Sequence, residues 1–132
     1  MDDKNVLVSG KDNDLSGNEI TVAFGRENTL KRTNNTLVTG YLNKVEDGSN
    51  NSVFGYLHDV SGNSQNTAVF GNKNEEYNGM NNMIGGNQQD ISGAVNVFGM
   101  GESNKVRSDK NSGSVGKPVS YTHLTLPTIL LV

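Results

Sequence analysis

A repeat of about fifteen residues constrains the fold of this chain more than any other feature of its sequence. All four phenylalanines directly precede a glycine, and the repeat places its glycines at positions 10, 25, 40, 55, 71, 85, 99 and 116. A disordered chain has no reason to place every Phe at one position of a repeat. A short period that continues almost from end to end is typical of a solenoid, in which each repeat forms one coil.

Each repeat has a second half, which contains a polar stretch, an apolar residue and often another glycine. Leu30, Tyr77 and Val106 take the place of that apolar residue where the glycine is lost or displaced. The strand segments hold Val, Phe, Thr and Ile, which favour β-structure, and the corners hold Gly and Asn, which adopt positive φ at little cost. The sequence therefore predicts an all-β fold, a parallel β-roll or solenoid of about eight short two-stranded coils.

The composition suits such a roll but leaves it a thin core. The 132 residues include 16 Gly and 20 Asn but no Cys or Trp, and only 33% are hydrophobic. One coil is expected to bury a Phe or Val and one further apolar residue, each contributing about 1.5–3 kcal/mol, whereas ordering each residue costs about 1–2 kcal/mol. We therefore expect a homotrimer, in which three chains bury apolar surface against one another.

Two sets of residues are candidates for contacts between chains or with a ligand. The first set is a predicted column of stacked side chains, for which core packing and a trimer interface are both possible: Phe24, Phe54, Phe70 and Phe98. The second set follows two consecutive repeat glycines and is a predicted, partly exposed apolar patch: Tyr41, Leu42, Tyr56 and Leu57. The sequence leaves open whether this patch contacts another chain or a ligand.

The repeats resemble the head domain of trimeric autotransporter adhesins. Residues 66–71 (Asn-Thr-Ala-Val-Phe-Gly) are similar to the Asn-Ser-Val-Ala-Ile-Gly strand of that family, and residues 35–40 match it with a polar residue before the glycine. Residues 51–55 and 96–99 are one and two residues short of the motif, which leaves the strand register open there. The resemblance covers roughly residues 5–116. It implies a left-handed β-roll, a homotrimer, and attachment to host-cell or matrix surfaces from the outer membrane of a bacterium.

Other stacked-coil proteins provide alternatives. A segment of another trimeric fibre, such as a phage tail fibre or tailspike, would share the architecture. A solenoid enzyme of the polysaccharide-lyase kind would need larger coils and a cluster of acidic and basic residues on one face, so we expect no enzyme. An ice-binding solenoid would need a flat array of Thr, and we expect the Thr residues of this chain not to align.

The sequence offers few groups for catalysis or for binding a metal. His58 is the only His of the repeat region, and we interpret it as a turn residue in the column of Asn43. Asp12 and Asp14 begin like a calcium-binding loop, but its twelfth residue, which should be Glu, is Ala23. We therefore expect no catalytic residue, cofactor or metal site. The net charge of −3 gives no indication of nucleic-acid binding.

Two segments are expected to interrupt the repeat. Glu75 and Glu76 fall where the glycine spacing lengthens to 16 residues, and we interpret them as a solvated bulge. Residues 118–132 leave the repeat and resemble the translation of a sequencing adapter. We therefore expect residues 1–117 to form the roll and residues 118–132 to be a non-native tail. The chain is expected to be a fragment without its signal peptide and membrane anchor, and without direct membrane contact.

Overall fold

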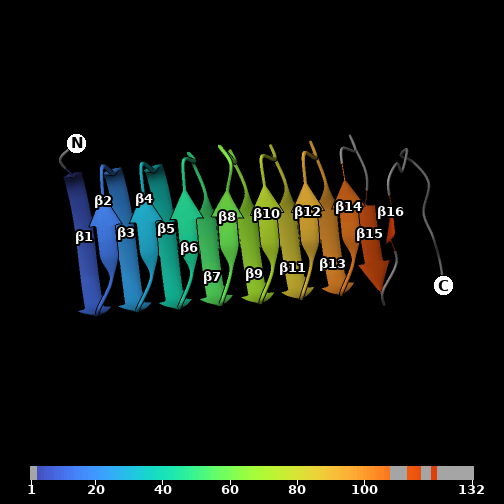
Figure 1. Cartoon of the computed structure of the whole chain (residues 1–132), viewed down its shortest axis with the longest axis horizontal. Coiled ribbons are helices and arrows are strands. Elements are labelled where there is room, and N and C mark those ends of the chain that lie inside the picture. The colour runs from blue at the N-terminus through green and yellow to red at the C-terminus, as the bar shows by residue number, and fades with distance from the viewer. Residues whose placement is uncertain (1–2, 108–112, 117–119, 122–132) are drawn as a thin grey trace.

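The protein is a flattened β-roll of about seven turns, in which every coil contributes one long and one short strand (Figure 1). The computed structural model describes residues 3–107, 113–116 and 120–121. The long strands form sheet A, which consists in spatial order of β1 (Lys4–Lys11), β3 (Glu19–Arg26), β5 (Asn34–Tyr41), β7 (Ser52–Tyr56), β9 (Ala68–Asn72), β11 (Met83–Asn87), β13 (Phe98–Glu102) and β15 (Gly113–Gly116).

The short strands form sheet B, which lies opposite sheet A across the narrow interior of the roll. Its members are β2 (Asp14–Ser16), β4 (Thr29–Lys31), β6 (Lys44–Glu46), β8 (Asp59–Ser61), β10 (Glu75–Tyr77), β12 (Asp90–Ser92), β14 (Lys105–Arg107) and β16 (Ser120–Tyr121). Each strand pairs in parallel with the strand one coil away, so the predicted β-roll is confirmed. No helix in the described part of the chain is long and apolar enough to cross a membrane.

The glycine column shows that the period is 15 residues in the second half of the roll. Gly71 pairs with Gly86, and Gly86 pairs with Gly101. The prediction of repeat glycines at positions 85 and 99 is therefore wrong, because the glycines of this column are Gly86, one residue later, and Gly101, two residues later. Residues of this column have φ between 109° and 132°, and a Cβ on Gly86 would overlap the backbone carbonyl of Gly101. Only glycine combines this backbone conformation with such a close approach between coils.

One inserted residue accounts for the single longer repeat. Ser49 and Gln65 are register partners although they are 16 residues apart. The pairing of β6 with β8 before this corner and that of β10 with β12 after it have a spacing of 15, whereas β8 and β10 pair at 16. The extra residue therefore lies within residues 62–64, in the corner after β8. The expectation of a solvated bulge at Glu75 and Glu76 is wrong, because both residues belong to β10 and Glu76 is only 1% exposed.

The interior is filled by one small or medium-sized apolar residue per strand. The sheet A column, fully buried, is Ala23, Val38, Val53, Val69 and Ile84. The sheet B column is Leu30, Val45, Val60, Ile91 and Val106. The phenylalanines point outward instead, and Phe24, Phe70 and Phe98 are 39%, 40% and 44% exposed, so the core interpretation of the Phe residues is wrong. Tyr77 also lies outside, because Glu76 takes the inward position of its strand.

A ladder of buried amides joins successive coils at one corner of the roll. The side chain of Asn43 donates from Nδ2 to the carbonyl of Gly55 (2.9 Å), and its Oδ1 accepts the backbone N–H of His58 (3.1 Å). Asn28 repeats the pattern one coil earlier, with Gly40 and Asn43 as partners. The ladder therefore satisfies the glycine carbonyls and corner amides that would otherwise be buried without partners. We call it the inner amide ladder; its members are Asn13, Asn28, Asn43, His58, Asn74 and Gln89.

Two described residues of the C-terminal segment belong to sheet B. Ser120 pairs with Lys105 and Tyr121 with Val106, so β16 continues sheet B one period after β14. This short strand falls within residues 118–132, which the sequence analysis assigned to a tail. The rest of that segment lies outside the described residues.

Candidate interaction surface

The outer face of sheet A carries two neighbouring columns of apolar side chains. Residues alternate inward and outward along each strand, so side chains two positions apart share the outer face. The first column contains Leu7, Val22, Leu37, Ala68, Met83 and Phe98, with Ser52 between Leu37 and Ala68. The second column contains Phe24, Phe54, Phe70 and Met100. We call these ten apolar residues the apolar face.

Much of the apolar face is accessible to solvent. Leu7 is 56% exposed and Met83 is 46% exposed, in addition to the phenylalanines described above. The rings of Phe54 and Phe70 stack with centroids 5.4 Å apart and an angle of 4° between their planes. Exposed apolar side chains that recur over so many coils, although Ser52, Thr39 and Gly85 interrupt the columns, are characteristic of an interaction site.

Phe98 belongs to the first column and not to the column of the other phenylalanines. Its register partner is Met83, whereas Met100 continues the column of Phe70 through Gly85. The predicted single column of four phenylalanines is therefore wrong in this coil. The sequence analysis also missed the rest of the first column. Its signal was present, because an apolar residue recurs two positions before Phe24 and Phe70.

The predicted patch of Tyr41, Leu42, Tyr56 and Leu57 lies at the adjoining edge of sheet A. Tyr41 and Tyr56 stack with centroids 5.4 Å apart, as the spacing predicts, and Arg26 lies 5.6 Å from the Tyr41 ring centroid. Tyr41, Tyr56 and Leu57 are each more than one-third exposed. The two leucines form the corner itself, with φ of 58° and 56°. This edge therefore extends the apolar face onto one corner of the roll.

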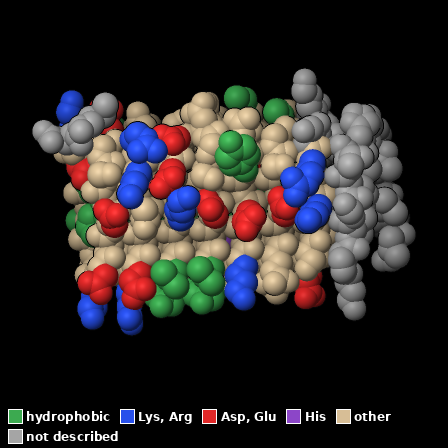
Figure 2. All heavy atoms as spheres, in the orientation of Figure 1, with side chains coloured by type: hydrophobic (Ala, Val, Ile, Leu, Met, Phe, Trp, Pro, Cys, Tyr) green, Lys and Arg blue, Asp and Glu red, His purple; other side chains and the backbone are tan. Residues whose placement is uncertain are grey.

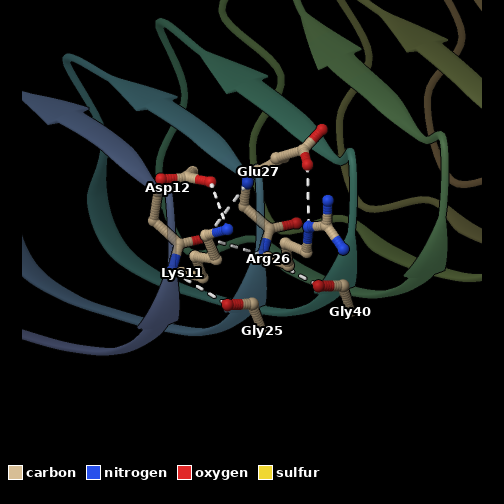
Figure 3. Close-up of polar contacts among 8 residues, drawn as sticks. Lys11, Asp12, Gly25, Arg26, Glu27 and Gly40 are labelled. Atoms are coloured by element: carbon tan, nitrogen blue, oxygen red, sulfur yellow. Dashed lines mark hydrogen bonds and ion pairs between the residues drawn. The ribbon is translucent and has the colours of Figure 1, made fainter.

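Charged pairs occupy the same corner in the first coils. Lys11 lies 3.8 Å from Asp12, and Arg26 donates to Glu27 over 2.8 Å (Figure 3). The backbone N–H of Glu27 also donates to the carbonyl of Lys11, which holds the two corners in register. Asp14 lies elsewhere, on the outer face of sheet B, 3.6 Å from Lys31. The structure therefore does not bring Asp12 and Asp14 together as a metal site, and no group of His, Cys, Asp and Glu in the described residues could hold one.

The outer face of sheet B is polar and carries charges of both signs (Figure 2). Lys44 lies 3.4 Å from Glu46 and 3.9 Å from Asp59, and Arg107 lies 2.6 Å from Asp90. These groups are exposed, so each pair contributes little to stability. The two outer faces of the roll thus differ sharply in chemistry, with sheet A apolar and sheet B charged.

A second row of amides lies at the corner before the apolar face, and its members are exposed. Asn50 donates to Asn66 over 3.0 Å, Asn66 to Asn81 over 2.9 Å, and Asn81 to Asn96 over 3.1 Å. All four residues have φ near 56°, a conformation that Asn adopts more readily than most residues. We call this row the outer amide ladder.

His58 takes the place of an Asn in the inner amide ladder, in the column of Asn43 as predicted. Its Nδ1 accepts the backbone N–H of Asn74 (3.2 Å) and its Nε2 lies 2.9 Å from the carbonyl of Phe54. The neutral ring with its proton on Nε2 therefore provides the acceptor and donor of an amide. Burial lowers the pKa of His58. Both ring nitrogens are engaged with backbone groups, which leaves neither for catalysis.

The Thr residues align better than expected, but inside the roll. Thr21 pairs in register with Thr36, and both are buried, as is Thr67. Among the described Thr residues, Thr39 lies on the outer face of sheet A. The expectation that the Thr residues do not align is therefore wrong, although their shared column faces the interior.

The comparison with known families decides the family. The description of the matching family is grass antifreeze beta roll, and the match extends over residues 2–99. The chain belongs to this family. Its membership agrees with the stacked two-stranded coils described above and supports a β-roll; the resemblance to trimeric autotransporter adhesins is supported only to that extent.

One comparison with a solved structure covers most of the chain at low similarity. The polySia-specific acetyltransferase NeuO has a TM-score of 0.40 and 12% sequence identity, over 90% of this chain and 83% of that one. No curated protein matches the chain.

Proposed function

We propose that the chain is a non-catalytic binding module, the head of a homotrimeric surface adhesin. Three copies pack the apolar face of sheet A around a common axis, and the charged outer face of sheet B and the corners remain outside to contact a host-cell or matrix surface. The observation that carries the proposal is the apolar face itself, which places ten apolar side chains outward across seven coils.

Two further features support this arrangement. No aromatic residue is among the buried apolar side chains of the described coils, so each of these coils has little core of its own. A trimer axis parallel to the roll would let every coil bury its outer apolar side chains against two copies of itself. Adhesion through many weak contacts along an extended trimer would then profit from multivalency. A bacterial cell surface is the proposed location.

Light scattering after size exclusion, at micromolar concentration, tests the proposal. The wild-type chain should elute with a mass close to three times its monomer mass of 14.2 kDa. The double variant Phe54→Ser, Phe70→Ser should dissociate at concentrations where the wild type is trimeric, because it removes the stacked pair without touching the interior. A matched control, Lys31→Ser with Glu75→Ser, changes exposed residues of sheet B and should stay trimeric.

A stable, monodisperse wild-type monomer with β-sheet circular dichroism would contradict the trimer. The adhesin function has its own measurement: the wild-type chain should bind immobilised matrix proteins or host cells, and the Phe variant should bind more weakly through loss of multivalency. A trimer that binds no such surface would retain the assembly and contradict the adhesive function.

Family membership favours a second candidate function, which is binding to ice. The outer amide ladder would provide a regular row of exposed polar groups, one per coil. The apolar face suits ice less well, because the position of Phe24 is occupied by Ser9, Thr39 and Gly85 in other coils, so its side chains differ in size. Thermal hysteresis and inhibition of ice recrystallisation would distinguish this function, and Asn66→Leu with Asn81→Leu should abolish it.

A further inference from the structure

A single acidic side chain interrupts the apolar column of sheet B. Glu76 lies between its register partners Val60 and Ile91, at a position that the other described coils fill with Leu, Val or Ile and, in β16, with Tyr121. It is only 1% exposed. A carboxylate ion in such surroundings is strongly disfavoured unless a cation or several hydrogen bonds compensate it.

The carboxyl group of Glu76 has incomplete compensation. Oε1 accepts a hydrogen bond from Nδ2 of Asn82 over 2.8 Å, and Nδ2 of Asn82 also donates to the carbonyl of Ala94. Oε2 is buried and has no hydrogen-bond partner. Gly79 makes room for the group, since a Cβ there would overlap Oε1. Burial raises the pKa of Glu76 to about 7, although hydrogen bonding by the side chains of Asn82 and Thr67 acts in the opposite direction. The protonated acid therefore fits this site better than the ion.

No described charged group faces Glu76 from the elements packed against it. Glu75 on its own strand, Asp59 on β8 and Asp90 on β12 all occupy outward positions of sheet B. The inward residues of β9 and β11 are Val69 and Ile84. Among the residues whose burial is described, the other buried titratable group is His58, whose ring nitrogens both contact backbone groups.

Glu76 also lies beside the irregular corner of the roll. The inserted residue falls within residues 62–64. The Oγ of Ser64 donates a hydrogen bond to the carbonyl of Ser61, and it accepts a long one of 3.4 Å from the backbone N–H of Gly79. This corner is built from small residues, and a longer chain path separates its two strands. The backbone bonds between coils continue through this corner, where the N–H of Gln65 donates to the carbonyl of Gly79 over 3.0 Å, but the extra residue breaks the 15-residue match between the corners.

We propose that Glu76 is a proton-controlled switch of coil stacking at the middle of the roll. In the folded roll Glu76 holds its proton, and release of that proton to solvent as the pH rises loosens the corner formed by residues 61–64 and 77–82. The two blocks of coils on either side remain intact. The switch is independent of trimer formation and of the proposed adhesive function.

Thermal unfolding between pH 5 and pH 9 tests the switch, with all chains in the His58→Asn background to remove the other buried titratable group. The parent chain should lose melting temperature as pH rises through about 7, since its folded state holds a proton that the unfolded state releases at lower pH. Glu76→Gln should show no such loss. The matched control Glu75→Gln, which changes the exposed neighbour, should keep the parent's pH dependence.

Two direct readouts on the wild-type chain keep the test decisive if a variant does not fold. Carboxyl carbon NMR should show Glu76 titrating near pH 7, and hydrogen exchange, corrected for intrinsic rates, should rise above that pH in residues 61–82 before the outer coils. A Glu76 carboxyl that titrates near 4.5, or equal pH dependence in Glu75→Gln and Glu76→Gln relative to parent, would overturn the proposal.

Discussion

Replacing Gly86 by Ala should destabilise the roll much more than replacing Gly99, although both glycines lie in sheet A strands of the second half of the roll. Gly86 has φ of 109°, and a Cβ on it would overlap the carbonyl oxygen of Gly101. A non-glycine residue in a sparsely populated region of this kind costs roughly 1–3 kcal/mol. Because the coils must also separate locally, we expect a loss of about 3 kcal/mol or more.

Gly99 occupies a different environment. It lies in the inward column that continues from Ile84, and its φ is outside the left-handed region. The nearest atom to an added Cβ would be Ile91 Cδ1 at 3.3 Å, the end of a flexible side chain. Gly99→Ala should therefore fall within about 1 kcal/mol of wild type, on the stabilising side, because Ala restricts the unfolded chain.

Urea and thermal unfolding followed by far-ultraviolet circular dichroism, at one fixed protein concentration, measure both effects. For a chain of this size, Gly86→Ala should lower the melting temperature by roughly 10 °C. Near-equal stability of Gly86→Ala and wild type would refute the argument for the glycine column. A large loss in Gly99→Ala would show instead that position 99 belongs to that column.

Three further predictions concern pH and metal. At pH 8, Glu76→Val should stabilise the roll by roughly 3 kcal/mol, the cost of a Glu pKa raised from 4.5 to about 7, and the gain should vanish below pH 4.5 in urea unfolding. His58→Asn should remove a loss of stability below about pH 6.5, because a lowered His pKa makes protonation favour the unfolded state; a wild-type chain insensitive to acid would contradict this. EDTA should leave the melting curve unchanged, whereas calcium-dependent stabilisation would contradict the absence of a described metal-ligating cluster.

The period in the sequence was enough to predict the coil architecture, because Gly and Asn at corners and β-branched residues in strands agree over many repeats. It could not determine the register at Phe98, since the Phe-Gly pair there imitates the pair at Phe70 while the true column glycine is Gly101. A strand register depends on which backbone groups pair, and a short apolar strand permits more than one choice.

The direction of the side chains was harder to predict for a physical reason. Both faces of the sheet A strands are apolar. The alternation of apolar and polar residues that usually distinguishes inward from outward side chains therefore does not show which way Phe24 or Phe70 points. Hydrophobicity alone also favoured Tyr77 over Glu76 as the buried residue of β10. Strict use of the 15-residue period from Ile91 would have placed Glu76 inside, because the two are register partners.

The inner amide ladder makes each coil depend on its immediate neighbours alone. The bonds of Asn43 reach residues 12 and 15 positions away, and the backbone pairings of the sheets have the same short reach in sequence. Cohesion in such an array is a sum over adjacent layers, as in a one-dimensional lattice. A completed coil can serve as the template for the next, and a break at a central layer divides the roll into two shorter stacks that each retain their internal order. Mechanical or thermal unfolding of this protein should therefore begin at its least stable layer. Additional coils increase the stability of the roll only if every layer remains folded.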